Sequence, residues 1–143
     1  MKNNRGFSLL ELLIVVAIIL IIATIAIPSL LRSRQAANES AAVANLRTVN
    51  TAQVTYLSSS GGTYGSMANL ISAKLLDDTF TGTKAGYNYS IVLDSIGQDY
   101  TAEAVPASTN TGRYGYYSIP DAVVRYSTNV SLAPAGQSGR SVQ

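Results

Sequence analysis

One acidic residue stands at the start of the longest apolar segment of the chain. Glu11 directly precedes residues 12–31, in which no charged residue occurs. About 20 apolar residues are enough to cross a bilayer as a helix. A lone carboxylate in lipid costs roughly 2.5 kcal/mol or more, so it usually has a partner. Glu11 is therefore the first candidate for a functional residue. The alternative is that it lies, neutral or reaching toward water, at the membrane surface.

The rest of the composition argues against catalysis and metal binding. The 143 residues include no His and no Cys. Their absence removes the commonest general base and metal ligand, every disulfide and every thiolate site. Serine is abundant, but no His is present to activate it. We therefore expect no catalytic residue, no metal site and no cofactor, and we expect Asp77 and Asp78 to form a solvated turn.

The charge is small and its distribution is uneven. The net charge is +2, too low to indicate a nucleic-acid binder. Lys2 and Arg5 supply two of the ten basic residues, and the chain has eight acidic ones, so the part after Gly6 is neutral. By the positive-inside rule, these two basic residues should hold the N-terminus in the cytoplasm.

Three interpretations compete for the N-terminal segment. A secretory signal has a shorter apolar stretch with a cleavage site after it. A plain membrane anchor fits the length but does not need Glu11. In the third interpretation the chain is cut before the apolar segment, which then stays in the mature protein. We prefer the third.

The leader and the first apolar residues form one continuous motif, Arg5-Gly6-Phe7-Ser8-Leu9-Leu10-Glu11. With the apolar segment that follows, it resembles the class III signal of type IV pilins and of the related pseudopilins of type II secretion. The resemblance is strong over residues 5–31 and only architectural afterwards. It implies that a membrane-embedded prepilin peptidase cuts after Gly6 and N-methylates Phe7. Pro28 falls where the family has its helix-disrupting proline.

Cleavage after Gly6 would give Glu11 a partner. The new amine of Phe7 would be a cation about one helical turn from Glu11. The pair could form within one subunit, or the amine could meet Glu11 of a neighbouring subunit. The resemblance favours the neighbour, so Phe7 and Glu11 are the expected assembly residues.

A single helix is expected over residues 7–57. Residues 32–57 are rich in Ala and contain no Gly or Pro, whereas residues 58–62 are a cluster of Ser and Gly that should end the helix. Such a helix is about 75 Å long, too long to be buried in so small a domain. Pro28 lacks an N–H, so the helix is expected to kink or loosen there.

The second half of this helix is amphipathic. One partly apolar stripe at helical spacing consists of Ala42, Leu46, Val49, Gln53 and Tyr56. The opposite side is expected to carry Arg34, Asn38, Asn45 and Thr48.

The rest of the chain predicts a small antiparallel sheet. A short helix is expected over residues 66–74, with Ser66 as its N-cap. Residues 87–93 and 100–104 then alternate with a period of two around Gly97, and residues 115–119 and 123–128 suggest a second hairpin. Residues 129–143 show no period and are expected to form an exposed, partly mobile tail. The predicted fold is α+β, one long helix packed on about four strands.

These patterns divide the chain into four parts. They are the leader (1–6), a transmembrane and filament-core half-helix (7–31), an amphipathic half-helix (32–60) and a globular β-sheet domain with a C-terminal tail (61–143). Our hypothesis is a non-enzymatic subunit of a type IV pilus, a homo-oligomeric helical filament. The resemblance implies three partners: the membrane before assembly, the prepilin peptidase and an inner-membrane assembly platform. It also implies an inner-membrane precursor and an extracellular pilus on the cell surface.

Two alternatives remain at this stage. A pseudopilin of a type II secretion system has the same N-terminal motif and apolar segment, but the major pseudopilins carry a calcium-binding loop near the C-terminus. This chain has no compact acidic cluster there, and it also lacks the cysteine pair found in many pilins. A DNA-binding minor pilin is disfavoured by the neutral charge after Gly6, because DNA affinity depends on basic residues.

Overall fold

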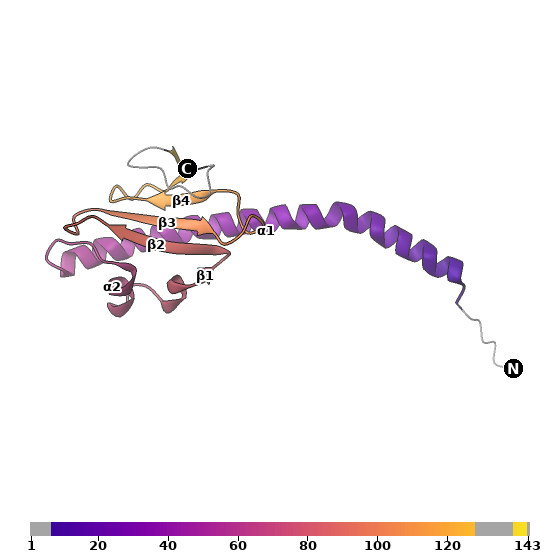
Figure 1. Cartoon of the computed structure of the whole chain (residues 1–143), viewed down its shortest axis with the longest axis horizontal. Coiled ribbons are helices and arrows are strands. Elements are labelled where there is room, and N and C mark those ends of the chain that lie inside the picture. The colour runs from indigo at the N-terminus through magenta and orange to yellow at the C-terminus, as the bar shows by residue number, and fades with distance from the viewer. Residues whose placement is uncertain (1–6, 128–138, 143) are drawn as a thin grey trace. The chain divides into compact units, whose positions relative to one another are not determined.

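A computed structural model describes residues 7–127 and 139–142. Its elements follow in the order α1 (Leu9–Ser59), α2 (Met67–Ser72), η1 (Asp78–Thr81), β1 (Thr83–Lys84), β2 (Tyr87–Leu93), β3 (Tyr100–Pro106), β4 (Gly115–Ser118), β5 (Arg125–Ser127) and β6 (Arg140–Ser141) (Figure 1). The chain divides into two compact units, Met1–Ser33 and Arg34–Gln143. The first unit contains the N-terminal part of α1, whereas the second contains the rest of α1 and every other element.

In the first unit α1 is an uninterrupted helix with its side chains in solvent. It begins at Leu9 and continues through Pro28, and α1 as a whole ends at Ser59, within two residues of the expected bounds. Two hydroxyls in this region donate to helix carbonyls, Thr24 Oγ1 to Ile21 O at 2.7 Å and Ser33 Oγ to Ser29 O at 3.1 Å. The expected kink at Pro28 does not interrupt the helix here, and its loosening within a filament stays a prediction.

In the second unit α1 packs against the sheet through the predicted stripe. Leu46 and Gln53 are fully buried, and Val49 is 1% exposed. The core that they share with the sheet contains Leu70, Phe80, Tyr87, Ala102 and Ala104. Burial of these apolar surfaces is the main force that stabilises this unit.

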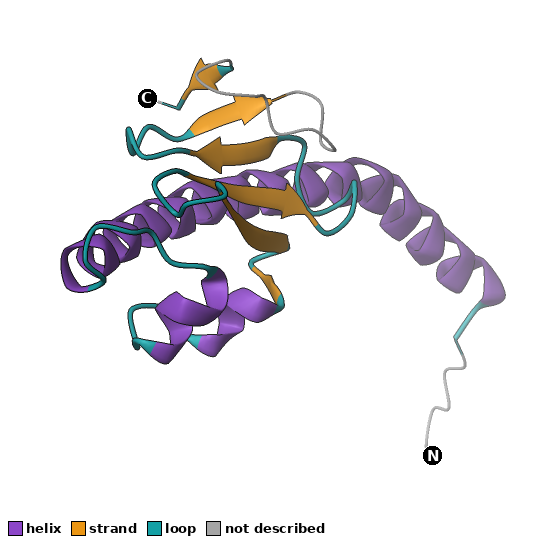
Figure 2. Ribbon diagram, turned by 60° about the vertical axis from the view of Figure 1, so that its left-hand side comes forward, coloured by secondary structure: helices purple, strands orange, loops and turns teal. Residues whose placement is uncertain are grey.

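The sheet has six antiparallel strands in the order β1-β2-β3-β4-β5-β6. Each strand pairs with its neighbours in sequence, and Figure 2 shows the sheet lying along the second part of α1. Both predicted hairpins are confirmed, as β2–β3 and β4–β5. The sequence predicted about four strands, because β1 and β6 have two residues each and are too short to show a period.

The segment that follows α1 is held by buried and capping hydrogen bonds. The Gln53 amide donates to Gly65 O at 2.7 Å and accepts from Gly65 N at 2.9 Å. Ser66 is the N-cap of α2, as predicted, and Leu70 of α2 is fully buried. Both polar atoms of this buried Gln in the apolar stripe therefore have a partner, so it fixes the return of the chain.

One expectation about the polar side of α1 is wrong. Asn38 and Asn45 do not lie on the side opposite the stripe but are half-buried: their amides donate to Thr111 O and Tyr89 Oη, each at 2.9 Å. Within the expected tail, Arg140–Ser141 is exposed and pairs with β5, a pairing that the sequence did not predict. In both cases the partner is distant in sequence, so local periodicity carries no signal of it. Residues 128–138 and 143 lie outside the described part of the chain.

Candidate functional site

Glu11 closes the N-terminus of α1 together with Ser8. The Ser8 backbone N–H donates to Glu11 Oε2 at 3.0 Å, and the Leu10 N–H donates to Ser8 Oγ at 3.3 Å. Ser8 is thus the N-cap residue and Glu11 the third residue of the helix, a variant of the capping box in which the Ser8 hydroxyl accepts from the second helical N–H instead of the third. The sequence-based interpretation of Glu11 missed this role, although the Ser-x-x-Glu spacing is its usual signature.

The described part of the chain places no cation beside the Glu11 carboxylate. No ion pair to Glu11 occurs among residues 7–127 and 139–142. The Phe7 side chain is 76% exposed directly before Ser8. The cap therefore orients the carboxylate at the helix end, and no cation of the described residues lies beside it.

The surface that follows Glu11 is apolar and uncovered. Large side chains remain exposed well along the helix: Leu20 at 61%, Ile25 at 72% and Leu30 at 65%. Within α1 a stretch is long and apolar enough to cross a membrane, and none of its residues is buried within the chain. Apolar patches on soluble monomers rarely exceed a few hundred Å², so this surface requires lipid or other protein.

Residues 1–27 match the family described as "Prokaryotic N-terminal methylation motif". Over 132 residues the chain is 34% identical to "Type IV wide pilus major component PilA4" of Thermus thermophilus, covering 92% of this chain and 93% of that protein. The chain belongs to the type IV pilin family.

A second pilin matches over a shorter region. The chain is 48% identical over 56 residues to "Type IV major pilin protein PilA" of Myxococcus xanthus, covering 39% of this chain and 26% of that protein. No solved structure matches the chain.

The processing site predicted for this pilin is only half described. Phe7 lies in the described part, in the non-helical residues before α1. Gly6 and the leader lie outside it. The capping box brings Ser8 to Glu11, and Pro28 lies almost five turns further along α1.

In the second unit of this pilin, an ion pair with three hydrogen bonds joins α1 to the β3–β4 loop. Glu39 is 7% exposed and accepts three hydrogen bonds from Arg113: from the backbone N at 2.9 Å, from Nε at 3.0 Å and from Nη2 at 2.8 Å. Burial acts to raise the pKa of Glu39, but the hydrogen bonds and charge of Arg113 outweigh it and hold the pKa below its usual value. The pair therefore stabilises the loop on the helix. Neither residue was singled out in the sequence.

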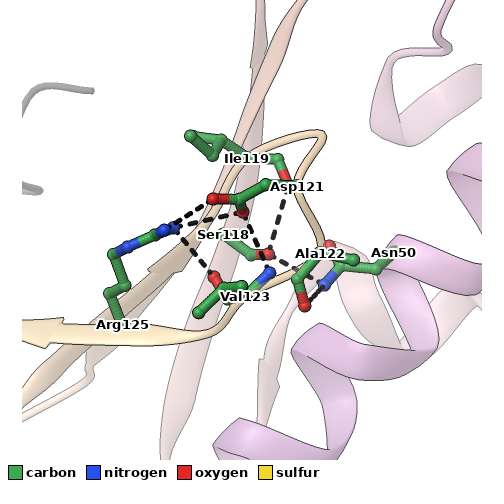
Figure 3. Close-up of polar contacts among 7 residues, drawn as sticks. All are labelled: Asn50, Ser118, Ile119, Asp121, Ala122, Val123 and Arg125. Carbon is green, nitrogen blue, oxygen red and sulfur yellow. Dashed lines mark hydrogen bonds and ion pairs between the residues drawn. The ribbon is translucent and has the colours of Figure 1, made fainter. Parts of the chain in front are cut away.

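A second polar contact holds the β4–β5 turn against α1. Asn50, which is 4% exposed, donates to Ser118 Oγ at 2.8 Å and to Ala122 O at 3.3 Å (Figure 3). Tyr100 Oη donates to Asn50 Oδ1 at 3.0 Å. All the hydrogen-bonding groups of the Asn50 amide thus find partners within the protein, as a buried amide requires.

Two further acids of the described residues, Asp121 and Asp77, form structural contacts. Asp121 pairs with Arg125, with one of its hydrogen bonds at 3.1 Å. Asp77 is the N-cap of η1 and pairs with Lys84 at 2.9 Å, which fits the expected turn. In the part of the chain that the structure describes, no group of three or more His, Cys, Asp or Glu residues is placed to hold a metal ion.

Proposed function

We propose that this pilin is a filament-forming structural subunit of a type IV pilus. The observation that carries this proposal is the uncovered apolar surface of α1 with a single carboxylate at its start. A bilayer covers that surface in the precursor, and the helices of other copies cover it in the filament. The similarity to a major pilus component along almost the whole chain supports a shaft-forming role.

Processing precedes assembly in this proposal. A prepilin peptidase cuts the chain between Gly6 and Phe7 in the inner membrane and methylates the new amine. The match of residues 1–27 to the methylation motif supports this step. An inner-membrane platform then moves the subunit from the bilayer into the extracellular filament.

Assembly joins the Phe7 amine of an incoming subunit to Glu11 of one already in place. Both groups are costly to leave unpaired where water is scarce. The capping box supports this role, because it holds the carboxylate at the helix end with one oxygen engaged by Ser8. Apolar packing alone would tolerate sliding, so the ion pair also sets the register between neighbouring helices.

Filaments sheared from cells that make this pilin test the proposal. N-terminal sequencing and intact mass should give a chain that begins with N-methylated Phe7. The matched control is Gly6→Val, whose side chain should obstruct the peptidase and leave uncut precursor in the membrane. Recovery of filaments whose subunits retain residues 1–6 would contradict the processing step, and absence of this chain from the sheared filaments would contradict the function.

A further inference from the structure

The turn between β2 and β3 presents an apolar side chain between two carboxylates. We call residues 94–99 the acidic turn. Ile96 is 65% exposed, and both Asp94 and Asp99 are exposed. Among the residues described, neither carboxylate pairs with a basic side chain. The turn thus offers negative charge and apolar surface, and no cation of the described residues neutralises that charge.

The backbone of the acidic turn is fixed by its own hydrogen bonds. Asp94 Oδ1 accepts from the N–H groups of Gln98 at 2.7 Å and Asp99 at 3.1 Å. Gly97 O accepts from the Tyr64 N–H at 2.8 Å, which ties the turn to the segment after α1. A surface that is already ordered loses little conformational entropy on binding, so the acidic turn is suited to dock.

An exposed arginine lies on α1 at the start of the second unit. We call residues 34–37 the basic turn. Arg34 is exposed and has no acidic partner in the described residues, and Ala37 is exposed one turn further along. Gln35 donates to Thr109 O at 2.9 Å, which places the β3–β4 loop beside this turn.

These two turns lie at opposite ends of the β2–β3 pair. Leu93 pairs with Tyr100 next to the acidic turn, and Tyr87 pairs with Pro106 at the other end. Asn38, which follows the basic turn directly, donates to Thr111 O in the loop that follows β3. Seven-residue strands separate their ends by about 20 Å. The opposite charges therefore cannot meet within one chain.

We propose that the acidic turn of one subunit docks on the basic turn of a second copy. Asp99 faces Arg34, and Ile96 packs on Ala37. Because the two surfaces differ, the contact is head-to-tail, and repeated contacts of this kind produce an open helical array. The inference rests on the proposed filament function, and it adds a contact between soluble domains to the packing of the apolar helices.

Engineered cysteines test the contact directly, because the chain contains no cysteine of its own. Filaments of the double variant Ile96→Cys/Ala37→Cys, oxidised and run without reductant, should give a ladder of dimers, trimers and longer species. Each single variant should run as a monomer. Filaments of the double variant that run only as monomers would overturn the proposal.

Charge exchange tests it independently, even where cysteine variants assemble poorly. Arg34→Glu and Asp99→Lys should each lower the yield of sheared filaments about tenfold, because like charges then face each other at every contact. The double variant should restore the yield. Lys74→Glu makes the same charge change at another exposed residue and should leave the yield unchanged.

The pattern of filament yields distinguishes this contact from a different role of Arg34. If Arg34→Glu lowers the yield and the double variant Arg34→Glu/Asp99→Lys does not restore it, Arg34 acts on another anion, such as a lipid headgroup, and the contact is refuted. Normal yield from both single variants refutes it as well. If the unaltered chain is absent from sheared filaments, the proposed function fails rather than this contact alone.

Discussion

Arg113 surrounds the Glu39 carboxylate with three hydrogen bonds of 2.8 to 3.0 Å, two from its guanidinium and one from its own backbone. This contact fixes the β3–β4 loop near the start of the second unit. Glu39→Gln should therefore destabilise a fragment of residues 34–143 by about 2 kcal/mol, because charged hydrogen bonds are stronger than neutral ones. Urea unfolding at pH 7 measures the loss. Asp78→Asn, at an exposed acid that pairs with no basic residue in the described part of the chain, is the control and should change stability little.

The same contact predicts a pH dependence. The pKa of Glu39 is lower in the folded protein than its usual value of 4.5. The unfolded chain therefore binds the proton more readily, and the stabilisation is complete above about pH 4.5 and lost as the pH falls toward the folded pKa. The difference in the free energy of unfolding between the unaltered fragment and Glu39→Gln should become smaller over that range. A difference that stays constant from pH 7 to pH 3 would contradict the assignment.

Asn50 makes a second contact in this unit whose contribution to stability can be measured. Asn50→Leu removes the buried amide, so Tyr100 Oη, Ser118 Oγ and Ala122 O each lose their hydrogen bond to it. Each unsatisfied buried group costs about 1 to 3 kcal/mol, so the fragment should lose about 3 kcal/mol of stability. Thr51→Ala, at the exposed neighbouring residue, should change it little. The double variant Asn50→Leu/Tyr100→Phe should lose less stability than the two single variants lose together, because the two groups are coupled. A loss equal to that sum would argue against a shared network.

Local periodicity predicted the elements of this fold but not the polar contacts between them. The stripe from Ala42 to Gln53, the cap at Ser66 and both hairpins are patterns within a few residues. Glu39 and Arg113 are 74 residues apart in sequence, so nothing local marks them as partners. The strands β1 and β6 are too short to show a period. The capping box of Ser8 and Glu11 is different, because its Ser-x-x-Glu pattern is local and could have been predicted from the sequence.

The region before Pro28 should lose regular helix when the subunit enters a filament. Pro28 provides no N–H to the Thr24 carbonyl, and the preceding residues 21–27 are largely β-branched. Neighbouring subunits and the Thr24 hydroxyl, which already donates to Ile21 O, can support the freed backbone. A filament map at side-chain resolution should show the loss between residues 21 and 27. Unbroken helical hydrogen bonding through Ala23 and Thr24 would contradict it.

The final prediction concerns the charge of Glu11. Glu11→Leu should be cleaved and inserted normally yet fail to polymerise alone, even though the change makes the helix more hydrophobic. This variant removes the capping hydrogen bond from Ser8 and, at the same time, the proposed ion pair with a neighbour's Phe7 amine. Two further variants are needed to separate them.

Glu11→Gln keeps the cap, because a glutamine at the third helical position accepts from the N-cap backbone as glutamate does, but it removes the charge. Ser8→Ala keeps the charge and removes the hydroxyl that accepts from Leu10 N. If pairing drives assembly, Glu11→Gln should yield few sheared filaments and Ser8→Ala should yield nearly the normal amount. The reverse pattern would make Glu11 a capping residue only. Normal filaments from Glu11→Leu would rule out both roles in assembly, because the apolar helix would then assemble without any carboxylate at its start.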